Sequence, residues 1–207
     1  MKKRISMILL FVLLFQLAAC STGKNGDANR LTKDGVAPYE LTEQESYLLQ
    51  SFGLGDGAKA ISFLAPKDAV SMEVNVYFLG EDQQWEKRDG GSISLGTAVS
   101  DAEQMSGIFT VKANPDHSLD IRINGAGSMS FSTYPVPMER EDEGSAAAFL
   151  KEFQQIELGR EIPVAIMVYD SGTEMSSFSA QDYFEQSKFE GMDLVQAVTL
   201  TFSAKGA

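Results

Sequence analysis

The sequence predicts an all-β protein, an antiparallel β-sandwich of the jelly-roll or immunoglobulin-like kind with one or two short helices. Two observations favour this fold class. Several short segments between Val70 and Ser203 alternate apolar and polar residues with a period of two, as strands with one buried face do. Segments rich in Gly, Pro and Asn separate these strands, as the tight turns of a sandwich require.

The first expected element is a short helix within "LTEQESYLLQSFGLGDG", residues 41–57. Thr42 and Glu45, three residues apart, form the pattern of a capping box at a helix N-terminus. The apolar residues 47–49 follow this cap, and Gly53 supplies a stop signal. One helix is therefore expected here.

The next segments predict strands. Every second residue from Val70 to Phe78 is apolar, so we expect one face of this strand in a core. The residues expected to face solvent are Ser71, Glu73, Asn75 and Tyr77. The segment "QQWEKRDGGSISLG" (83–96) then predicts a second strand, a turn at Gly90-Gly91 and a third strand.

The segment "GIFTVKANPDHSLDIRING" (107–125) predicts a β-hairpin. Apolar residues alternate on both sides of an Asn-Pro-Asp-His turn at 114–117, which carries typical turn residues. "SMSFSTYPV" (128–136) continues the hairpin as a meander, and "IPVAIMVYD" (162–170) and "LVQAVTLTFS" (194–203) predict two late strands.

One segment, "SAAAFLKEFQQIEL" (145–158), fits two structures. Phe149, Phe153 and Ile156 have the spacing of a helix that Gly159 would end. Residues 153–158 fit an edge strand equally well. The sequence leaves this choice between helix and strand open.

The chain begins with the pattern of a secretory signal peptide. Three basic residues at positions 2–4 precede a largely apolar run over 5–17, and alanines follow at 18 and 19. This run is shorter than the roughly 20 residues that a transmembrane helix needs. We therefore expect residues 1–19 to be a signal peptide that is removed.

The four residues Leu17-Ala18-Ala19-Cys20 resemble the lipobox of bacterial lipoproteins. The resemblance implies cleavage before Cys20 and attachment of diacylglycerol to its sulfur, so that the protein is held at the membrane on the cell surface. A thiolate is the nucleophile that such a thioether needs. A plain signal peptide that happens to precede a cysteine is the alternative. Segments 159–173 and 189–202 resemble surface lipoproteins of Gram-positive bacteria, a likeness that implies no activity.

Charge and composition divide the expected mature chain into a tether and one domain. Without residues 1–19 the chain has 14 Lys and Arg against 29 Asp and Glu, a formal charge of −15. Such a chain repels phosphate backbones, so nucleic acid is not an expected partner, and the lipid has to provide the anchoring. Residues 20–38 are polar and read as a lipidated flexible tether. Residues 39–207 are expected to form a single sandwich domain.

The inventory of reactive side chains excludes several kinds of site. The chain has one histidine, His117, and one cysteine, Cys20, so a zinc site built on His and Cys is excluded. We expect His117 to be solvated at its hairpin tip. No phosphate-binding glycine loop or EF-hand spacing occurs. The acidic residues within 139–143 match no calcium loop and predict a solvated loop. The sequence thus predicts no metal and no cofactor.

The strongest enzymatic signal is "AIMVYDSGTE" (165–174), in which Asp170 follows an apolar strand. The segment Asp170-Ser171-Gly172-Thr173 resembles the signature of aspartic proteases, in which two aspartates share one proton to activate water. The chain carries one copy, so a homodimer would have to supply the second. The same residues also form a good turn after a strand.

A binding role is the main functional prediction. Trp85 could stack on a sugar ring, although packing at a strand edge is the alternative. We predict a lipid-anchored, extracytoplasmic binding or interaction module whose ligand is a glycan or a protein. The alternative function is a hydrolase that uses carboxylates, either a glycosidase or an aspartic-protease-like enzyme through Asp170.

Overall fold

The computed structural model describes residues 31–51, 57–94, 104–125, 127–138, 144–172 and 177–204. The predicted signal peptide, Cys20, Gly53 and the acidic residues 139–143 lie outside these ranges. The described residues belong to the compact unit Leu31–Ala207. No helix within the described ranges is long and apolar enough to cross a membrane.

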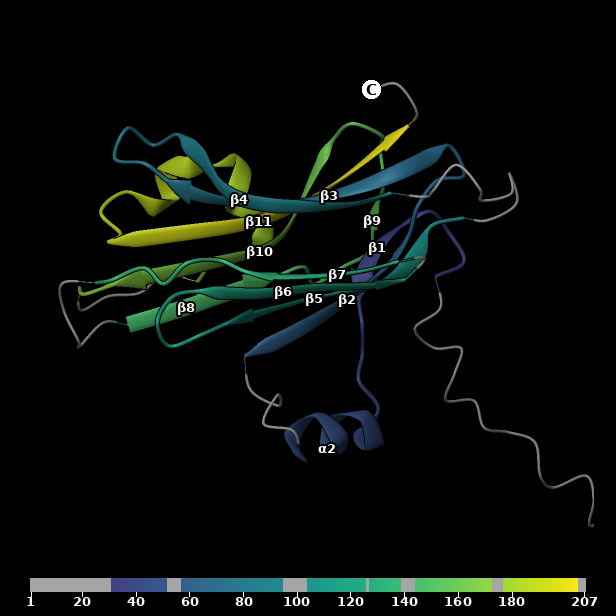
Figure 1. Cartoon of the computed structure of the whole chain (residues 1–207). Coiled ribbons are helices and arrows are strands. Elements are labelled where there is room, and N and C mark those ends of the chain that lie inside the picture. The colour runs from purple at the N-terminus through teal and green to yellow at the C-terminus, as the bar shows by residue number, and fades with distance from the viewer. Residues whose placement is uncertain are drawn as a thin grey trace, which may run out of the picture. The chain divides into compact units, whose positions relative to one another are not determined.

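The described strands form two antiparallel sheets that stack as the two layers of a sandwich (Figure 1). Sheet I has the order β7-β6-β5-β2-β1-β9, and sheet II has the order β4-β3-β11-β10-β8. This arrangement confirms the predicted all-β sandwich.

The elements have the following bounds. The strands of sheet I are β1 (Gly35–Pro38), β2 (Ala58–Leu64), β5 (Ser106–Ala113), β6 (Leu119–Gly125), β7 (Ser128–Ser132) and β9 (Gln154–Gln155). The strands of sheet II are β3 (Ala69–Leu79), β4 (Trp85–Ser94), β8 (Gly144–Phe149), β10 (Glu161–Asp170) and β11 (Leu194–Ala204). The helical elements are α2 (Glu43–Ser51) and the short 3₁₀ helices η1 (Ala180–Phe184) and η2 (Gln186–Phe189).

The main core lies between the two sheets and contains apolar side chains from both. The Phe63 ring of β2 and the Phe202 ring of β11 meet across it, with their centroids 5.9 Å apart. Burial of such apolar area is the main favourable term in folding. The alternation of apolar and polar residues in the sequence therefore indicates which face of a strand lies in this core.

A second apolar layer covers the outer face of sheet II. Side chains of β10 and β11 pack there against Phe178, Tyr183 and Phe189. Strand β10 is thus buried on both faces, which explains its nearly continuous apolar sequence. The expectation that Asn75 and Tyr77 face solvent is wrong, because this layer covers them: Asn75 is buried, and the Tyr77 ring contacts the Tyr183 ring.

Elements that depend on neighbouring residues form as predicted. Helix α2 begins at a capping box, in which Thr42 N–H donates to Glu45 Oε2 (2.8 Å) and Glu45 N–H donates to Thr42 Oγ1 (3.2 Å). In the β5–β6 hairpin Phe109 lies opposite Ile123. Strand β7 pairs with β6 and continues the meander. These parts of the prediction are confirmed.

The predicted turn at Gly90-Gly91 is wrong, because both glycines lie inside the continuous strand β4. A Cβ atom on Gly90 would stand 2.7 Å from the Val74 carbonyl oxygen, and one on Gly91 would stand 2.6 Å from Met129 Sδ of sheet I. At Gly90 the close atom belongs to the backbone, so glycine is required there for the close approach of the neighbouring strand. The sequence shows the glycines but not what approaches them.

The folded unit begins before residue 39, within the range predicted as tether. Residues 35–38 form β1, which pairs antiparallel with β2 on one side and with β9 on the other. Val36 is fully buried in the main core. A four-residue strand that contains Gly35 and Pro38 has a weak strand signal, so only its pairing reveals it.

The structure resolves the choice left open for residues 145–158 in favour of strands. Residues 144–149 form β8, which pairs along its length with β10, and only Gln154–Gln155 form a short edge strand, β9. The helix is the wrong alternative. Alanine favours helices when isolated, but pairing with β10 outweighs that propensity at Ala146–Ala148.

Candidate functional site

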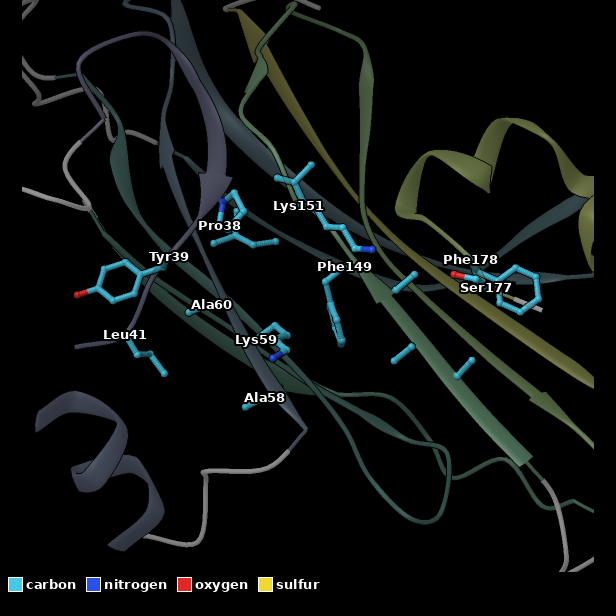
Figure 2. A pocket seen from close by; sticks show the side chains of 15 residues that line it. Pro38, Tyr39, Leu41, Ala58, Lys59, Ala60, Phe149, Lys151, Ser177 and Phe178 are labelled. Carbon is cyan, nitrogen blue, oxygen red and sulfur yellow. The ribbon is translucent and has the colours of Figure 1, made fainter. Parts of the chain in front are cut away.

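A groove lies on the side of the sandwich where β2 of sheet I comes near β8 of sheet II. We call it the β2–β8 groove (Figure 2). Its volume is about 640 Å³, within the range of ligand-binding clefts. The lining residues are Pro38, Tyr39, Leu41, Ala58, Lys59, Ala60, Ile61, Ala146, Ala147, Ala148, Phe149, Leu150, Lys151, Ser177 and Phe178.

The groove exists because sheet I does not cover the end strand of sheet II. Ala147 and Phe149 lie on the same face of β8, and Phe149 packs against the main core. Ala147 is nevertheless exposed, because no strand of sheet I lies over it in the described part of the chain. The inner face of β8 is thus open at this position.

Two lysines reach the groove from inward-facing positions. Lys59 shares its face of β2 with the core residues Ile61 and Phe63. Lys151 follows Phe149 by two residues. Figure 2 shows the Phe149 ring between these two lysines, and Lys59 Nζ lies 6.0 Å from its centre. The Lys59 position would suit an apolar core residue if the sandwich were closed here.

The two lysines give the groove a positive charge on an acidic protein. No carboxylate lies within salt-bridge distance of Lys59 or Lys151 among the residues that the structure describes. The described residues that line the groove include no Asp or Glu, although the whole chain has a formal charge of −12. Two ammonium groups in this position favour an anionic ligand group.

The described lining of the groove combines basic side chains with apolar surface. No family model, curated protein or solved structure matches this chain. Within the described ranges no three His, Cys, Asp or Glu side chains stand close enough to hold a metal ion. The described residues of the groove lining also include no His or Cys. The described lining offers two ammonium groups, the hydroxyls of Tyr39 and Ser177, strand backbone and apolar surface.

An apolar hollow of about 260 Å³ adjoins the groove beneath α2. It shares Tyr39, Leu41 and Ala60 with the groove lining. Helix α2 has no buried residue and is joined to its preceding segment by polar contacts: Tyr39 OH donates to Glu45 Oε1 (2.7 Å). The Thr42 backbone N–H and the Tyr39 hydroxyl lower the pKa of Glu45.

Trp85 lies at the start of β4, on the outer side of sheet II and away from the groove. Its ring stacks on Tyr183 with centroids 5.1 Å apart and an interplanar angle of 16°. Its Nε1–H donates to the Tyr183 carbonyl oxygen (2.8 Å). Tyr183 therefore occupies one face of the ring that a sugar would stack on.

Glu161, at the start of β10, links the 3₁₀ helix η1 to sheet II. Its carboxylate accepts hydrogen bonds from Tyr77 OH (2.5 Å), Tyr183 OH (2.8 Å) and Thr199 Oγ1 (3.0 Å). Burial, and then the nearby Glu161 carboxylate, raises the pKa of both Tyr77 and Tyr183. Each of these donors belongs to the protein itself, and Tyr183 is part of η1. The cluster therefore holds η1 on the outer face of sheet II.

Asp170 and His117 do not reach the groove lining. Asp170 is buried at the end of β10, and the next residue, Ser171, donates its N–H to Asp193 Oδ2 (2.7 Å). The ring of His117 lies against the Tyr169 ring, with centroids 4.5 Å apart. His117 Nδ1 lies 2.9 Å from the Val136 carbonyl oxygen, which can only accept. His117 is therefore half-buried at the hairpin tip rather than fully solvated.

Sequence reasoning missed the groove. One signal was available: in "AKAISFL" (58–64), Lys59 stands where the alternation calls for an apolar residue. The three small residues Ala146–Ala148 were a second signal, since they leave space above β8. Neither signal identifies a groove unless β2 and β8 are already known to lie near each other.

Proposed function

We propose that this chain is a lipid-anchored, extracytoplasmic binding module and that the β2–β8 groove is its ligand-binding surface. The observation that carries the proposal is the pair of inward-facing lysines around Phe149 in a groove of about 640 Å³. Lys59 and Lys151 both lack a carboxylate partner among the described residues. An apolar platform flanked by cations is suited to a ligand that carries both apolar and anionic groups.

The location follows from the lipobox resemblance at Leu17–Cys20. A diacylglycerol on Cys20 provides two acyl chains, which is enough for stable anchoring. The residues between Cys20 and β1 would then form a short polar connection to the domain. A domain held this way meets its ligands outside the cytoplasm, where glycans and proteins of the cell surface are available.

The proposal is tested by titrating the full chain, held in detergent, with cell-wall glycans and with cell-surface proteins. For a ligand bound in the groove, Phe149→Ala should lower the affinity about tenfold or more, because it removes the apolar platform. Phe184→Ala is the matched control, since Phe184 is a half-exposed ring outside the groove. It should leave the affinity unchanged.

The same titrations separate the groove from Trp85. A ligand that loses affinity in Trp85→Ala but not in Phe149→Ala would place the binding surface on the outer side of sheet II and contradict the groove. Failure of both ligand classes to bind the parent chain would contradict the binding proposal as a whole.

A further inference from the structure

Strand β8 is an edge strand with backbone groups directed into the β2–β8 groove. Within the described residues β8 pairs only with β10. Leu150 N–H donates to the Val164 carbonyl oxygen, so the backbone of residue 150 faces β10. Residues of an antiparallel strand alternate in this respect. The N–H and C=O groups of Ala147 and Phe149 therefore point away from β10, toward the open edge.

Within β8 itself, this edge lacks the features that protect an edge strand from pairing. The segment Gly144–Phe149 contains no charged residue and no proline, and its register with β10 is continuous. The opposite edge of sheet II is protected: β4 carries four consecutive charged residues at 86–89 and a bulge opposite Val76 and Tyr77. Natural edge strands are commonly blocked by such charges and bulges. The contrast between the two edges indicates that the β8 edge is available for pairing with another strand.

The facing side of the groove also has an open backbone edge. The Ala60 carbonyl accepts from Tyr39 N–H (2.9 Å), so residue 60 of β2 directs its backbone toward β1. By alternation, Ala58 directs its backbone the same way. The pairing of β1 with β2 starts only at Ile61. An added strand on β8 would thus run near the uncovered start of β2.

We propose that the β2–β8 groove binds an extended, acidic peptide segment, which adds to β8 as a further strand of sheet II. The proposal rests on the groove being the binding surface of this protein. Six consecutive residues of the lining, Ala146–Lys151, offer a track of roughly 20 Å at the rise of a β-strand. This length matches a peptide segment of about six residues.

The side chains of the groove define the pattern of the peptide. Residues on one face of adjacent strands lie side by side, so the residue opposite Lys151 shares a face with the one opposite Phe149. An acidic side chain beside Lys151 and an apolar one beside Phe149 would satisfy both. The peptide should therefore carry Asp or Glu two residues away from an apolar residue, and Lys59 adds a second attraction for negative charge.

Backbone pairing is the reason to favour a peptide over a glycan. Main-chain hydrogen bonds supply affinity in strand addition, and pockets for alternate side chains supply specificity. The open N–H and C=O groups of Ala147 and Phe149 recur at the two-residue spacing of a strand. A peptide backbone matches this repeat at every second residue.

The probe for the test is a phage library of random peptides of about ten residues, selected on the full chain in detergent. Selected peptides are then synthesised and titrated. We expect them to contain Asp or Glu at two-residue spacing from an apolar residue. Amide hydrogen exchange of the bound chain gives the direct readout: the Ala147 and Phe149 amides should become protected, whereas the Ala146 and Ala148 amides already donate to β10.

The decisive variant is Ala147→Pro, which removes one outward N–H without removing a bond to β10. It should weaken peptide binding about tenfold or more, whereas the control Gly127→Ala, at an open position outside the groove lining, should retain binding. Lys59→Gln combined with Lys151→Gln should lower affinity about tenfold at low salt and flatten its salt dependence. Lys67→Gln, at an exposed lysine outside the groove, should change neither property.

The outcomes separate this inference from the proposed function. Peptides that bind without protecting the Ala147 and Phe149 amides would overturn strand addition, even where Ala147→Pro fails to fold. If the library yields no binder while a glycan or protein still binds in a Phe149-dependent way, strand addition is wrong and the groove remains the binding surface. If Phe149-dependent binding is absent for every probe, both proposals are wrong.

Discussion

Lys59 Nζ lies 6.0 Å from the centre of the Phe149 ring, and this contact joins the inner face of β2 in sheet I to the edge strand β8 of sheet II. A cation held over an aromatic face is attracted by the ring quadrupole. The pair therefore links the two sheets at the side where they are least covered by each other. The same pair forms the centre of the β2–β8 groove.

The Lys59–Phe149 contact should be measurable as a coupling between two mutations. In a double-mutant cycle of Lys59→Gln and Phe149→Leu, we expect a coupling of about 0.5 kcal/mol in the free energy of unfolding, typical of an exposed cation–π pair. Urea denaturation of the four proteins measures it. Additive effects within error would show that the lysine does not interact with the ring in solution.

The Glu161 cluster predicts how stability changes at high pH. Burial and the Glu161 carboxylate raise the pKa of Tyr77 and Tyr183 above the ordinary value near 10. The pKa values of both tyrosines are raised in the folded state. Their contribution to the free energy of unfolding is therefore complete below about pH 10 and is lost as the pH rises above it. Urea unfolding should therefore give a constant free energy up to about pH 10 and a falling one beyond.

Tyr183→Phe provides the control for this pH dependence. It removes one hydrogen bond to a carboxylate, so we expect a loss of about 1–3 kcal/mol in unfolding free energy at neutral pH. It also removes one of the two titrating groups, so the decline above pH 10 should be shallower than in the parent. An equally steep decline would show that Tyr183 is not part of the alkaline transition.

A side chain at Gly90 should carry a steric cost inside β4. In Gly90→Ala the new Cβ would stand 2.7 Å from the Val74 carbonyl oxygen, so strand or backbone must shift. We expect a loss of about 1–3 kcal/mol in unfolding free energy, typical of overpacking. Gly127→Ala is the control, since no atom lies within 4 Å of the added Cβ, and it should change stability by less than about 0.5 kcal/mol. Equal effects would contradict the steric reading.

The neighbouring Gly91 shows where sequence reasoning reaches its limit, because a Cβ atom on it would meet Met129 of β7. The capping box at Thr42 and the β5–β6 hairpin could be predicted because their partners are a few residues apart in the chain. The roles of Gly91 and of β1 depend on strands that are distant in sequence, β7 and β9. The groove depends on the relative position of two sheets. Only the fold brings Lys59, Phe149 and Lys151 together, although each was visible in the sequence.

The resemblance of Leu17–Cys20 to a lipobox predicts membrane attachment through one sulfur. Cys20→Ala should abolish labelling by a fatty-acid analogue and move the protein out of the membrane fraction, because no other residue offers the thiolate that the lipid needs. Cell fractionation and metabolic labelling measure both effects. Continued membrane attachment of the variant, together with an unlabelled parent, would contradict the lipoprotein proposal.

The surroundings of the Asp170 carboxylate predict that the chain has no aspartic-protease activity. The chemistry needs two carboxylates that share one proton, one as base and one as acid. The structure places Asp193 at the same turn, but one of its carboxylate oxygens accepts from the Ser171 backbone N–H at 2.7 Å, as in a structural turn. Gly172 also lies so close that a Cβ there would stand 2.6 Å from Asp170 Oδ2, so this tight turn packs directly on the Asp170 carboxylate.

The full chain, incubated with unfolded protein between about pH 3 and pH 6, the range in which a carboxylate pair shares a proton, should therefore produce no pepstatin-sensitive cleavage. Asp170→Asn should behave like the parent in this assay. Cleavage that pepstatin blocks and that Asp170→Asn lacks would establish the enzymatic alternative. Since Asp170 lies outside the β2–β8 groove lining, Phe149→Ala in the same assay would show whether such an activity also depends on that groove.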